Sequence, residues 1–211
     1  MDWWPVIRRI IADYGSEPAP DHVSEDPFRV LIGCILSQRT RDETTDSAYS
    51  RLFSRFPTLK DLASADPSEV EKLIYPVGFY RNKARTIVRA ARYILEEFNG
   101  VVPDRFEDLV RIPGIGRKCA NIVLAYAFGR PAIPVDTHVF RVAVRLGIVD
   151  ENARPGDVER ELQRIVPKEQ WISVNHALVR FGRSVCRPLR PKCDECPFKE
   201  VCRHYRKYAA G

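Results

Sequence analysis

Long apolar runs are missing from this sequence of 211 residues, and none approaches the roughly 20 residues that a membrane-spanning helix needs. The first residues, Met1 to Trp4, also lack the basic and apolar layout of a signal peptide. Alternation of apolar and polar residues, the signal of a half-buried strand, is scarce. We therefore expect a soluble, cytoplasmic protein that is built mainly of helices and has no membrane partner.

The composition favours a globular protein with a polyanionic partner. Hydrophobic residues make up 45% of the chain, which suffices for one compact unit or two small ones. The formal net charge is +6, so nucleic acid is a reasonable class of partner. Between Arg183 and Lys207, eight Lys or Arg residues stand against three acidic residues, so much of the positive charge is local.

Start and stop signals divide most of the chain into helices, which predicts an all-α fold. Pro27 suits a first helical turn, Asp42 suits an N-cap and Asn99-Gly100 suits a helix stop. The expected helices cover residues 3–14, 27–38, 43–55, a segment from Asp66, 81–98, 104–111, 117–128, 137–146, 157–166, 170–182 and 197–207.

A turn with two glycines, Pro113 to Gly116, leads directly into a helical pattern. Such a hairpin between apolar helices turns backbone N–H groups outward, a geometry suited to phosphate oxygens. The positive end of the helix dipole disfavours an ammonium at Lys118, which favours a usable neutral amine there. Asp136, which precedes Thr137 and His138, is a candidate partner. The pattern suggests an amine nucleophile mounted on a clamp for the DNA backbone.

Ordinary structural roles also fit these residues. A lysine in a first helical turn is usually solvated, and Asp136 before Thr137 suits a plain N-cap. We interpret His138 as a structural hydrogen-bonding residue, because Lys118 and Asp136 already fill the chemical roles.

Four of the six cysteines form a C-x6-C-x2-C-x5-C pattern: Cys186, Cys193, Cys196 and Cys202. In a chain expected inside the cell, such clustering argues against structural disulfides. Four thiolates suit a tetrahedral zinc ion or a 4Fe-4S cluster, and the spacing does not separate the two. Either metal would stiffen the basic loop between the first two cysteines, which has few apolar residues of its own. Cys34 and Cys119 are expected to be small buried residues.

In these motifs and their order the chain resembles the endonuclease III family of helix-hairpin-helix DNA glycosylases and AP lyases. The resemblance covers nearly the whole length. It rests on Leu36-Ser37-Gln38 with Asp42, on Val77 to Ala84, on the hairpin from Ile112 to Ala120 with Lys118, on Val135 to Arg141 and on the cysteine pattern.

The resemblance implies the helix-hairpin-helix glycosylase fold, with two helical domains and a cleft between them. One domain is a six-helix bundle over residues 20–131, with the hairpin at about 112–118. The other combines residues 1–19 with 132–211 and holds a 4Fe-4S cluster on the four cysteines of the loop 186–202, with zinc as the alternative metal.

The resemblance also implies a bifunctional DNA glycosylase and AP lyase of base excision repair that removes oxidised or damaged pyrimidines from duplex DNA. Lys118 matches the residue that attacks the sugar, and Asp136 matches the residue that assists it. An amine bound at C1′ can open to a Schiff base and permit β-elimination, which a hydroxyl nucleophile cannot do. We expect a monomer that associates with the nucleoid and binds duplex DNA containing a damaged base or an abasic site.

Contacts to the DNA backbone are expected from two places. The backbone of Gly114 and Gly116 should approach a phosphate, and the cluster loop should meet the strand nearby. The residues expected to make the loop contacts are Arg187, Arg190 and Lys192.

Contacts to the bases are expected at the end of the expected helix 27–38, in the residues just after it, and at Phe79. An ungapped match to the family motif puts Arg39, with Gln38 adjacent, where a side chain fills the space left by a flipped base. It puts Phe79 where a leucine wedges the opposite strand. The best-known bacterial pattern has glutamine as the filling residue, so the opposite-base preference is left open. Asp42 is a candidate for the base pocket.

Two other functions are compatible with the sequence. The nearer is a thymine or uracil mismatch glycosylase of the same superfamily, although Lys118 argues against its purely monofunctional form. Gly33 stands where adenine-removing relatives carry a catalytic glutamate, which disfavours that activity. The farther alternative is a non-catalytic helix-hairpin-helix DNA-binding protein, for which substitution of Lys118 would remove no reaction.

Overall fold

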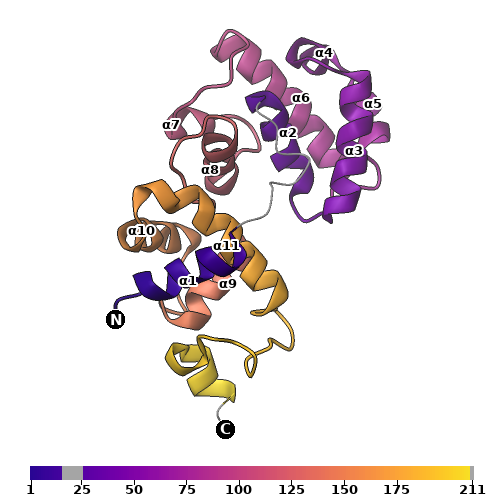
Figure 1. Cartoon of the computed structure of the whole chain (residues 1–211). Coiled ribbons are helices and arrows are strands. Elements are labelled where there is room, and N and C mark those ends of the chain that lie inside the picture. Colours follow the sequence, from indigo (N-terminus) through magenta and orange to yellow (C-terminus); the bar gives the residue numbers. More distant parts are fainter. Residues whose placement is uncertain (16–25, 210–211) are drawn as a thin grey trace. The chain divides into compact units, whose positions relative to one another are not determined.

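The chain is described by a computed structural model, which covers residues 1–15 and 26–209 (Figure 1). Within these two ranges all the regular elements are helical and there is no strand. The all-α class predicted from the sequence is therefore confirmed. None of the helices in the described ranges combines the length and the apolar character that a membrane crossing requires.

The chain divides into two compact units. The first, which we call the hairpin unit, is Ala19–Arg130, and the second, the tail unit, combines Met1–Pro18 with Pro131–Gly211. The hairpin unit contains α2 (Pro27–Ser37), α3 (Asp42–Arg55), α4 (Leu59–Ser64), α5 (Pro67–Ile74), α6 (Tyr80–Glu97), α7 (Phe106–Leu109) and α8 (Arg117–Tyr126). The tail unit contains α1 (Trp4–Tyr14), α9 (Thr137–Leu146), α10 (Pro155–Ile165), α11 (Trp171–Ser184) and short turns at Lys168–Gln170, Lys199–Val201 and Tyr205–Ala209 (Figure 1).

Helix α2 forms the buried centre of the hairpin unit. It starts where the carboxylate of Asp26 accepts a hydrogen bond from the backbone N–H of Phe28 at 2.9 Å, with Pro27 in the first turn. Its sequence is almost wholly apolar, with Arg29 as its one charged residue, and its residues from Val30 to Leu36 are buried. Contacts with α3, α6 and α8 cover it. The residues that follow Ser37 therefore start from the end of a buried helix.

Some helix boundaries differ from those predicted. Helix α3 begins at Asp42 itself, with Arg41 as the N-cap, so the predicted cap at Asp42 is off by one residue. Helix α4 was not among the predicted ranges, although Thr58 and Asp61 form a capping box at its start.

The C-terminal segment 197–207 is not the single helix expected there. A 3₁₀ turn, Lys199–Val201, ends at Cys202, whose backbone is extended with ψ of 120°. A π-helical turn, Tyr205–Ala209, follows. The expected continuous helix is wrong because an extended residue, the last cysteine of the pattern, interrupts it.

The core of the tail unit joins distant parts of the chain around Phe181 of α11. This ring is buried and lies edge-on to Tyr14, with 5.4 Å between the ring centroids, and to Phe198 at 5.7 Å. Phe198 stands between the last two cysteines of the pattern. The cysteine-rich segment is therefore anchored to α11 by a buried aromatic contact, in addition to anything that a metal contributes.

Candidate functional site

The turn between α7 and α8 has the geometry of a helix-terminal anion site. Ile112 and Ile115 are buried, and the N–H of Ile115 donates to the carbonyl of Ile112 at 3.0 Å, which closes the turn. Gly116 is the N-cap of α8, and no side chain of the described residues caps this end. The first-turn N–H groups of α8 therefore lack the usual side-chain acceptor, as expected where an anion is to be bound.

The two glycines of this turn serve different purposes, and alanine substitutions should separate them. Gly114 has φ of +84°, and a Cβ there would lie 2.3 Å from Cγ2 of Thr86. Gly116 has φ of −95°, and a Cβ there would meet no atom within 4 Å. Gly114→Ala should lower the free energy of unfolding by about 1–3 kcal/mol, because the backbone is strained and Thr86 is branched at Cβ.

Gly116→Ala is the matched control for that strain. The change should cost about 1 kcal/mol or less, since only the N-cap preference is lost. Its methyl group would lie on the surface proposed for a phosphate, so DNA affinity should fall although the fold is intact. Chemical denaturation and a DNA titration measure the two effects, and equal losses of stability in both variants would contradict this division of roles.

Lys118 and Asp136 lie in different units, and each has a defined local setting. Lys118 is exposed in the first turn of α8. Asp136 is the N-cap of α9, where its Oδ1 accepts from the backbone N–H groups of His138 at 2.9 Å and Val139 at 2.8 Å. The ordinary N-cap role that the sequence allowed for Asp136 is therefore present in the structure.

His138 belongs to a structural hydrogen-bond network. The Nη2 of Arg141 donates to its Nδ1 at 3.0 Å and to the carbonyl oxygen of Gly182 at 2.7 Å. Burial lowers the pKa of His138, and the nearby positive charge of Arg141 adds to that effect, although Asp136 opposes it. A neutral imidazole held by an arginine suits a structural role for His138.

The segment after α2 brings several predicted DNA-contacting residues together. The Nε2 of Gln38 donates to the carbonyl oxygen of Gly114 at 3.2 Å and to the sulfur of Cys119 at 3.7 Å. The guanidinium carbon of Arg39 lies 5.8 Å from the centroid of the Phe79 ring, which is 63% exposed. Gln38 is thus tied to the hairpin, and Arg39 is paired with Phe79.

The remaining base-contact and core residues have simpler settings. Asp42 is exposed in the first turn of α3. Cys34 and Cys119 are buried in the hairpin unit, as expected. A hydrogen bond to Cys119 and burial both raise the pKa of the Cys34 thiol.

Lys83, which was not among the predicted site residues, is only 6% exposed. Its ammonium group reaches the end of α2 and donates to the carbonyl oxygen of Leu36 at 2.7 Å. Burial lowers the pKa of Lys83 to about 8. The sequence feature that could have revealed its burial is its position on α6, on the same side as Ala84 and Ile87, both of which are buried.

The four cysteines of the tail lie within electrostatic reach of one another, but they are not arranged as a ligand set. Cys186, Cys196 and Cys202 pack against the core of the tail unit. Burial raises the pKa of Cys193, and the neighbouring charges of Cys202 and Cys186 add to that effect. In the part of the chain that the structure describes, no three His, Cys, Asp or Glu side chains are grouped to hold a metal ion.

Two arginines of α9 fasten the cysteine segment, and the sequence reasoning missed both. Arg145 donates to the carbonyl oxygens of Arg187 at 2.6 Å and Pro188 at 3.0 Å. Arg141 donates from Nε to the carbonyl oxygen of Cys186 at 2.9 Å. They stand four residues apart, on one face of α9. This spacing was the sequence feature that could have indicated a shared binding role.

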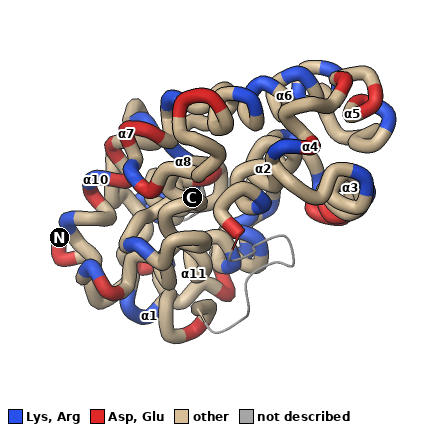
Figure 2. Tube along the Cα trace, turned by 90° about the horizontal axis from the view of Figure 1, so that it is seen from above, with Lys and Arg blue, Asp and Glu red and all other residues tan. Residues whose placement is uncertain are grey.

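The three basic residues expected on the cluster loop differ in availability. Arg187 and Arg190 are exposed. Lys192 forms an ion pair with Glu195 at 2.9 Å, which offsets part of its charge. Basic positions also occur on the helices of both units, beside acidic ones (Figure 2), so the charge is less confined to the tail than the sequence suggested.

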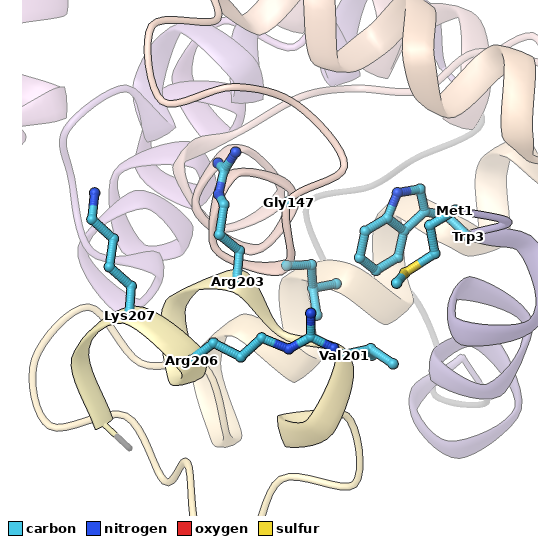
Figure 3. A pocket seen from close by; sticks show the side chains of 8 residues that line it. Met1, Trp3, Gly147, Val201, Arg203, Arg206 and Lys207 are labelled. Carbon is cyan, nitrogen blue, oxygen red and sulfur yellow. The ribbon is translucent and has the colours of Figure 1, made fainter. Parts of the chain in front are cut away.

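A surface pocket of about 490 Å³ in the tail unit is lined by none of the predicted site residues. Arg203 donates from Nη2 to the carbonyl oxygens of Val144 at 2.7 Å and Val149 at 2.8 Å. Arg206 donates from Nε to the carbonyl oxygen of Glu200 at 2.9 Å. These cations hold the C-terminal turns in place. The lining residues are Met1, Trp3, Leu146, Gly147, Val201, Arg203, Arg206 and Lys207 (Figure 3).

Comparisons with known proteins point to one family. Residues 32–168 match the model described as HhH-GPD superfamily base excision DNA repair protein. "Endonuclease III" of Thermotoga maritima is 45% identical over 191 residues, which is 90% of this chain and 89% of that protein. A solved structure of a trapped endonuclease III–DNA covalent intermediate, an estranged-adenine complex, has 37% identity and a TM-score of 0.86, covering 96% of this chain and 97% of that one. A thermostable thymine-DNA glycosylase has 26% identity and a TM-score of 0.87, covering 96% of both chains.

Proposed function

Because this chain belongs to the endonuclease III family within the HhH-GPD superfamily of base excision DNA repair proteins, we propose that Lys118 and Asp136 are its catalytic residues. The chain is a DNA glycosylase with AP lyase activity, and its partner is duplex DNA. The family predicted from the order of the sequence motifs is thereby confirmed, at 45% identity over 90% of the chain.

The observation that carries the assignment of Lys118 is an exposed amine in the first turn of an uncapped helix, directly after the Gly114–Gly116 turn. A phosphate held by that turn would bring a sugar close to the amine. The target nucleotide must first leave the base stack, which costs a few kcal/mol and costs least for a damaged base. The amine of Lys118 then forms a bond to C1′ as the base departs. The adduct opens to a Schiff base, and loss of a C2′ proton expels the 3′ phosphate.

The proposed role of Asp136 is electrostatic. A carboxylate beside C1′ would stabilise the positive charge that develops as the base leaves, and it could take a proton from Lys118 through a water molecule. Since the cap of α9 uses Oδ1, this role falls to Oδ2 of Asp136.

We propose that the other predicted site residues bind DNA. The exposure of Phe79 and its contact with Arg39 support insertion of both side chains into the base stack, with Gln38 beside them. Asp42 remains the candidate for the base pocket. The residues proposed to contact the strand backbone are Gly114, Gly116, Arg187, Arg190 and Lys192.

We also propose two domains, residues 20–131 and residues 1–19 with 132–211. The division of the chain into compact units at Arg130 and Pro131 supports these boundaries. Oxidised pyrimidines are the proposed substrates. We also propose a cytoplasmic monomer that associates with the nucleoid through DNA binding.

The four cysteines of the tail are proposed to hold a 4Fe-4S cluster, with zinc as the alternative. The kind of donor fits, since four thiols stand within seventeen residues, Cys186 to Cys202, and no disulfide engages them. Metal binding would have to draw together side chains that are not grouped as ligands in the described structure. When bound, the cluster would cross-link the tail and order the basic loop. Arg145 already fixes that loop through the carbonyl oxygens of Arg187 and Pro188, so the metal would complete an existing framework.

Cys193→Ser should lose the metal and weaken DNA binding. Among the described residues, Cys193 is not one of those that form or pack against the tail-unit core, so the main effect should be loss of one ligand and of loop order. Iron, sulfide and zinc analysis of the purified protein, with a DNA titration, measures both effects. Cys34→Ala is the matched control, a thiol removed outside the pattern, and should keep the metal. A wild-type protein with one zinc and no iron would support the alternative, and a metal-free protein with full DNA affinity would overturn the site.

Borohydride trapping tests the proposed function. The wild-type protein should form a covalent complex on a duplex containing thymine glycol and on an abasic duplex, because borohydride reduces the Schiff base that joins them. A complex on the abasic duplex alone would keep the lyase and redirect the substrate. No complex on either duplex, from protein with its metal intact, would overturn the Schiff-base mechanism.

One other substrate class is supported by a structural relative. The likeness to a thermostable thymine-DNA glycosylase at 26% identity favours mismatched thymine or uracil as the second candidate. Duplexes with thymine or uracil opposite guanine, run beside thymine glycol, decide between the two by the relative rates of base release.

A further inference from the structure

In the described part of the hairpin unit, three non-glycine residues lie in the left-handed region of the backbone: Asn99, after the end of α6, and Arg39 and Phe79, in two other exposed turns. Arg39, after α2, has φ of 53°, and Phe79, before α6, has φ of 58°. Residues other than glycine adopt this conformation uncommonly and at a cost of about 1–3 kcal/mol, and such residues cluster at functional sites. Contacts with other residues must therefore stabilise the turns at Arg39 and Phe79.

Lys83 supplies contacts to the first of these turns. Besides the carbonyl oxygen of Leu36, its ammonium group donates to the carbonyl oxygen of Gln38 at 2.5 Å and to Oγ1 of Thr40 at 3.0 Å. The carbonyl groups at a helix C-terminus carry partial negative charge, so an ammonium is favourable there. Lys83 thus binds carbonyl groups at the C-terminal end of α2 and contacts the residues on both sides of Arg39.

Thr40 links the first turn to the second. Its Oγ1 accepts a hydrogen bond from the backbone N–H of Gly78 at 3.2 Å and donates one to the carbonyl oxygen of Gln38 at 3.2 Å. The backbones touch as well, because a Cβ on Gly78 would lie 2.8 Å from the carbonyl oxygen of Arg39. Gly78 directly precedes Phe79, so the hydroxyl of Thr40 connects Lys83 to both strained residues.

We propose that Lys83 is a positioning residue that acts through Thr40 to hold Arg39 and Phe79 as a preorganised pair for insertion into the base stack. This inference rests on the proposed function, and it concerns capture of the nucleotide, not the chemistry at the sugar. Free side chains would have to be ordered on each encounter with DNA, whereas a pair held in advance avoids that cost. The contact between the Arg39 guanidinium and the Phe79 ring is consistent with a pair that acts together.

Variants at Thr40 test the link with little risk to the fold. Thr40→Val keeps the volume and removes the hydroxyl, and Thr40→Ser keeps the hydroxyl. On duplex DNA with a damaged base, Thr40→Val should lower the single-turnover rate by about tenfold to a hundredfold, since small misplacements have effects of that size. Thr40→Ser should stay within about twofold of the wild-type rate. Lys83→Met, the direct variant, should lower the duplex rate at least as much as Thr40→Val.

Cleavage of a single-stranded abasic oligonucleotide distinguishes a positioning role from a general structural one. Loss of positioning should leave this cleavage intact, whereas a structural defect should slow it. The oligonucleotide has no opposite strand and no intact stack, so strand cleavage needs the amine of Lys118 but not the inserted pair. Thr40→Val and Lys83→Met should cleave it within about twofold of wild type.

The possible outcomes separate this inference from the function on which it rests. Equal losses on duplex and single-stranded DNA would overturn the positioning role and indicate a general structural one. Wild-type rates for Thr40→Val and Lys83→Met on the duplex would overturn it as well, with the proposed function intact. A wild-type protein that forms no trapped complex on an abasic duplex would overturn the proposed function, and this inference with it.

Discussion

Replacement of Lys118 by glutamine is expected to abolish the borohydride-trapped complex and to lower the rate of strand cleavage by about 10⁴-fold or more, as for other nucleophile deletions. Glutamine is similar in length and suits a helix, so the exposed first turn of α8 should be unaffected. No other amine in that turn can form the Schiff base, because its other cation is Arg117. Trapping on an abasic duplex measures the first effect, and single-turnover cleavage measures the second.

Arg117→Gln is the matched control for the loss of charge. Arg117 is the neighbouring cation of the same helical turn, and its guanidinium carbon lies 4.7 Å from the centroid of the Phe106 ring. The variant should keep the trapped complex and lose some DNA affinity, with a shallower salt dependence if a phosphate contact is lost. If Lys118→Gln still cleaves while Arg117→Gln does not, the nucleophile has been assigned to the wrong residue.

The parts of the fold and the site that the sequence predicted are set by local rules. Helix α9 was predicted over residues 137–146 and has these bounds, Thr137–Leu146; in the structure Asp136 caps its start, and Gly147, with φ of 99°, ends it. The hairpin was predicted from its two glycines, of which only Gly114 needs the left-handed backbone. Each helix end and the hairpin turn depend only on residues that lie close to them in the sequence.

The parts that the sequence did not predict depend on contacts between distant residues. Lys83 reaches Leu36, forty-seven positions away, and Arg145 reaches Arg187, forty-two positions away. Their side chains satisfy carbonyl groups whose need for a partner arises only after the helices have packed. The motif that contains Lys83 was visible in the sequence, but the acceptors that give it a role were not.

Arg39 and Phe79 also show this difference between local sequence and long-range contacts. An ungapped match to the family motif marked both residues, but their pairing across two turns requires the backbone contact between Gly78 and Arg39. The local sequence therefore predicts which residues are inserted. Their preorganisation depends on the packing of the hairpin unit.

The second large effect is expected for Asp136→Asn, which separates the two roles of this residue. Asparagine caps a helix as well as aspartate does, so the start of α9 and the free energy of unfolding should change by less than about 0.5 kcal/mol. The negative charge is lost, and the rate of base removal should fall by about 10²- to 10⁴-fold, the usual size of a lost acid-base or electrostatic contribution. Denaturation and single-turnover base release on a damaged duplex measure these effects independently.

Two further variants make the assignment of Asp136 specific. Asp66→Asn changes an N-cap in the same way at α5, where the carboxylate accepts from the N–H of Ser68 at 2.8 Å, and it should leave base release unchanged. Asp136→Ala removes both cap and charge, so it should add a loss of about 1 kcal/mol in stability to the same loss of rate. If Asp136→Asn kept the wild-type rate and only Asp136→Ala were slow, the cap alone would matter. The charge that assists Lys118 would then have to come from another carboxylate.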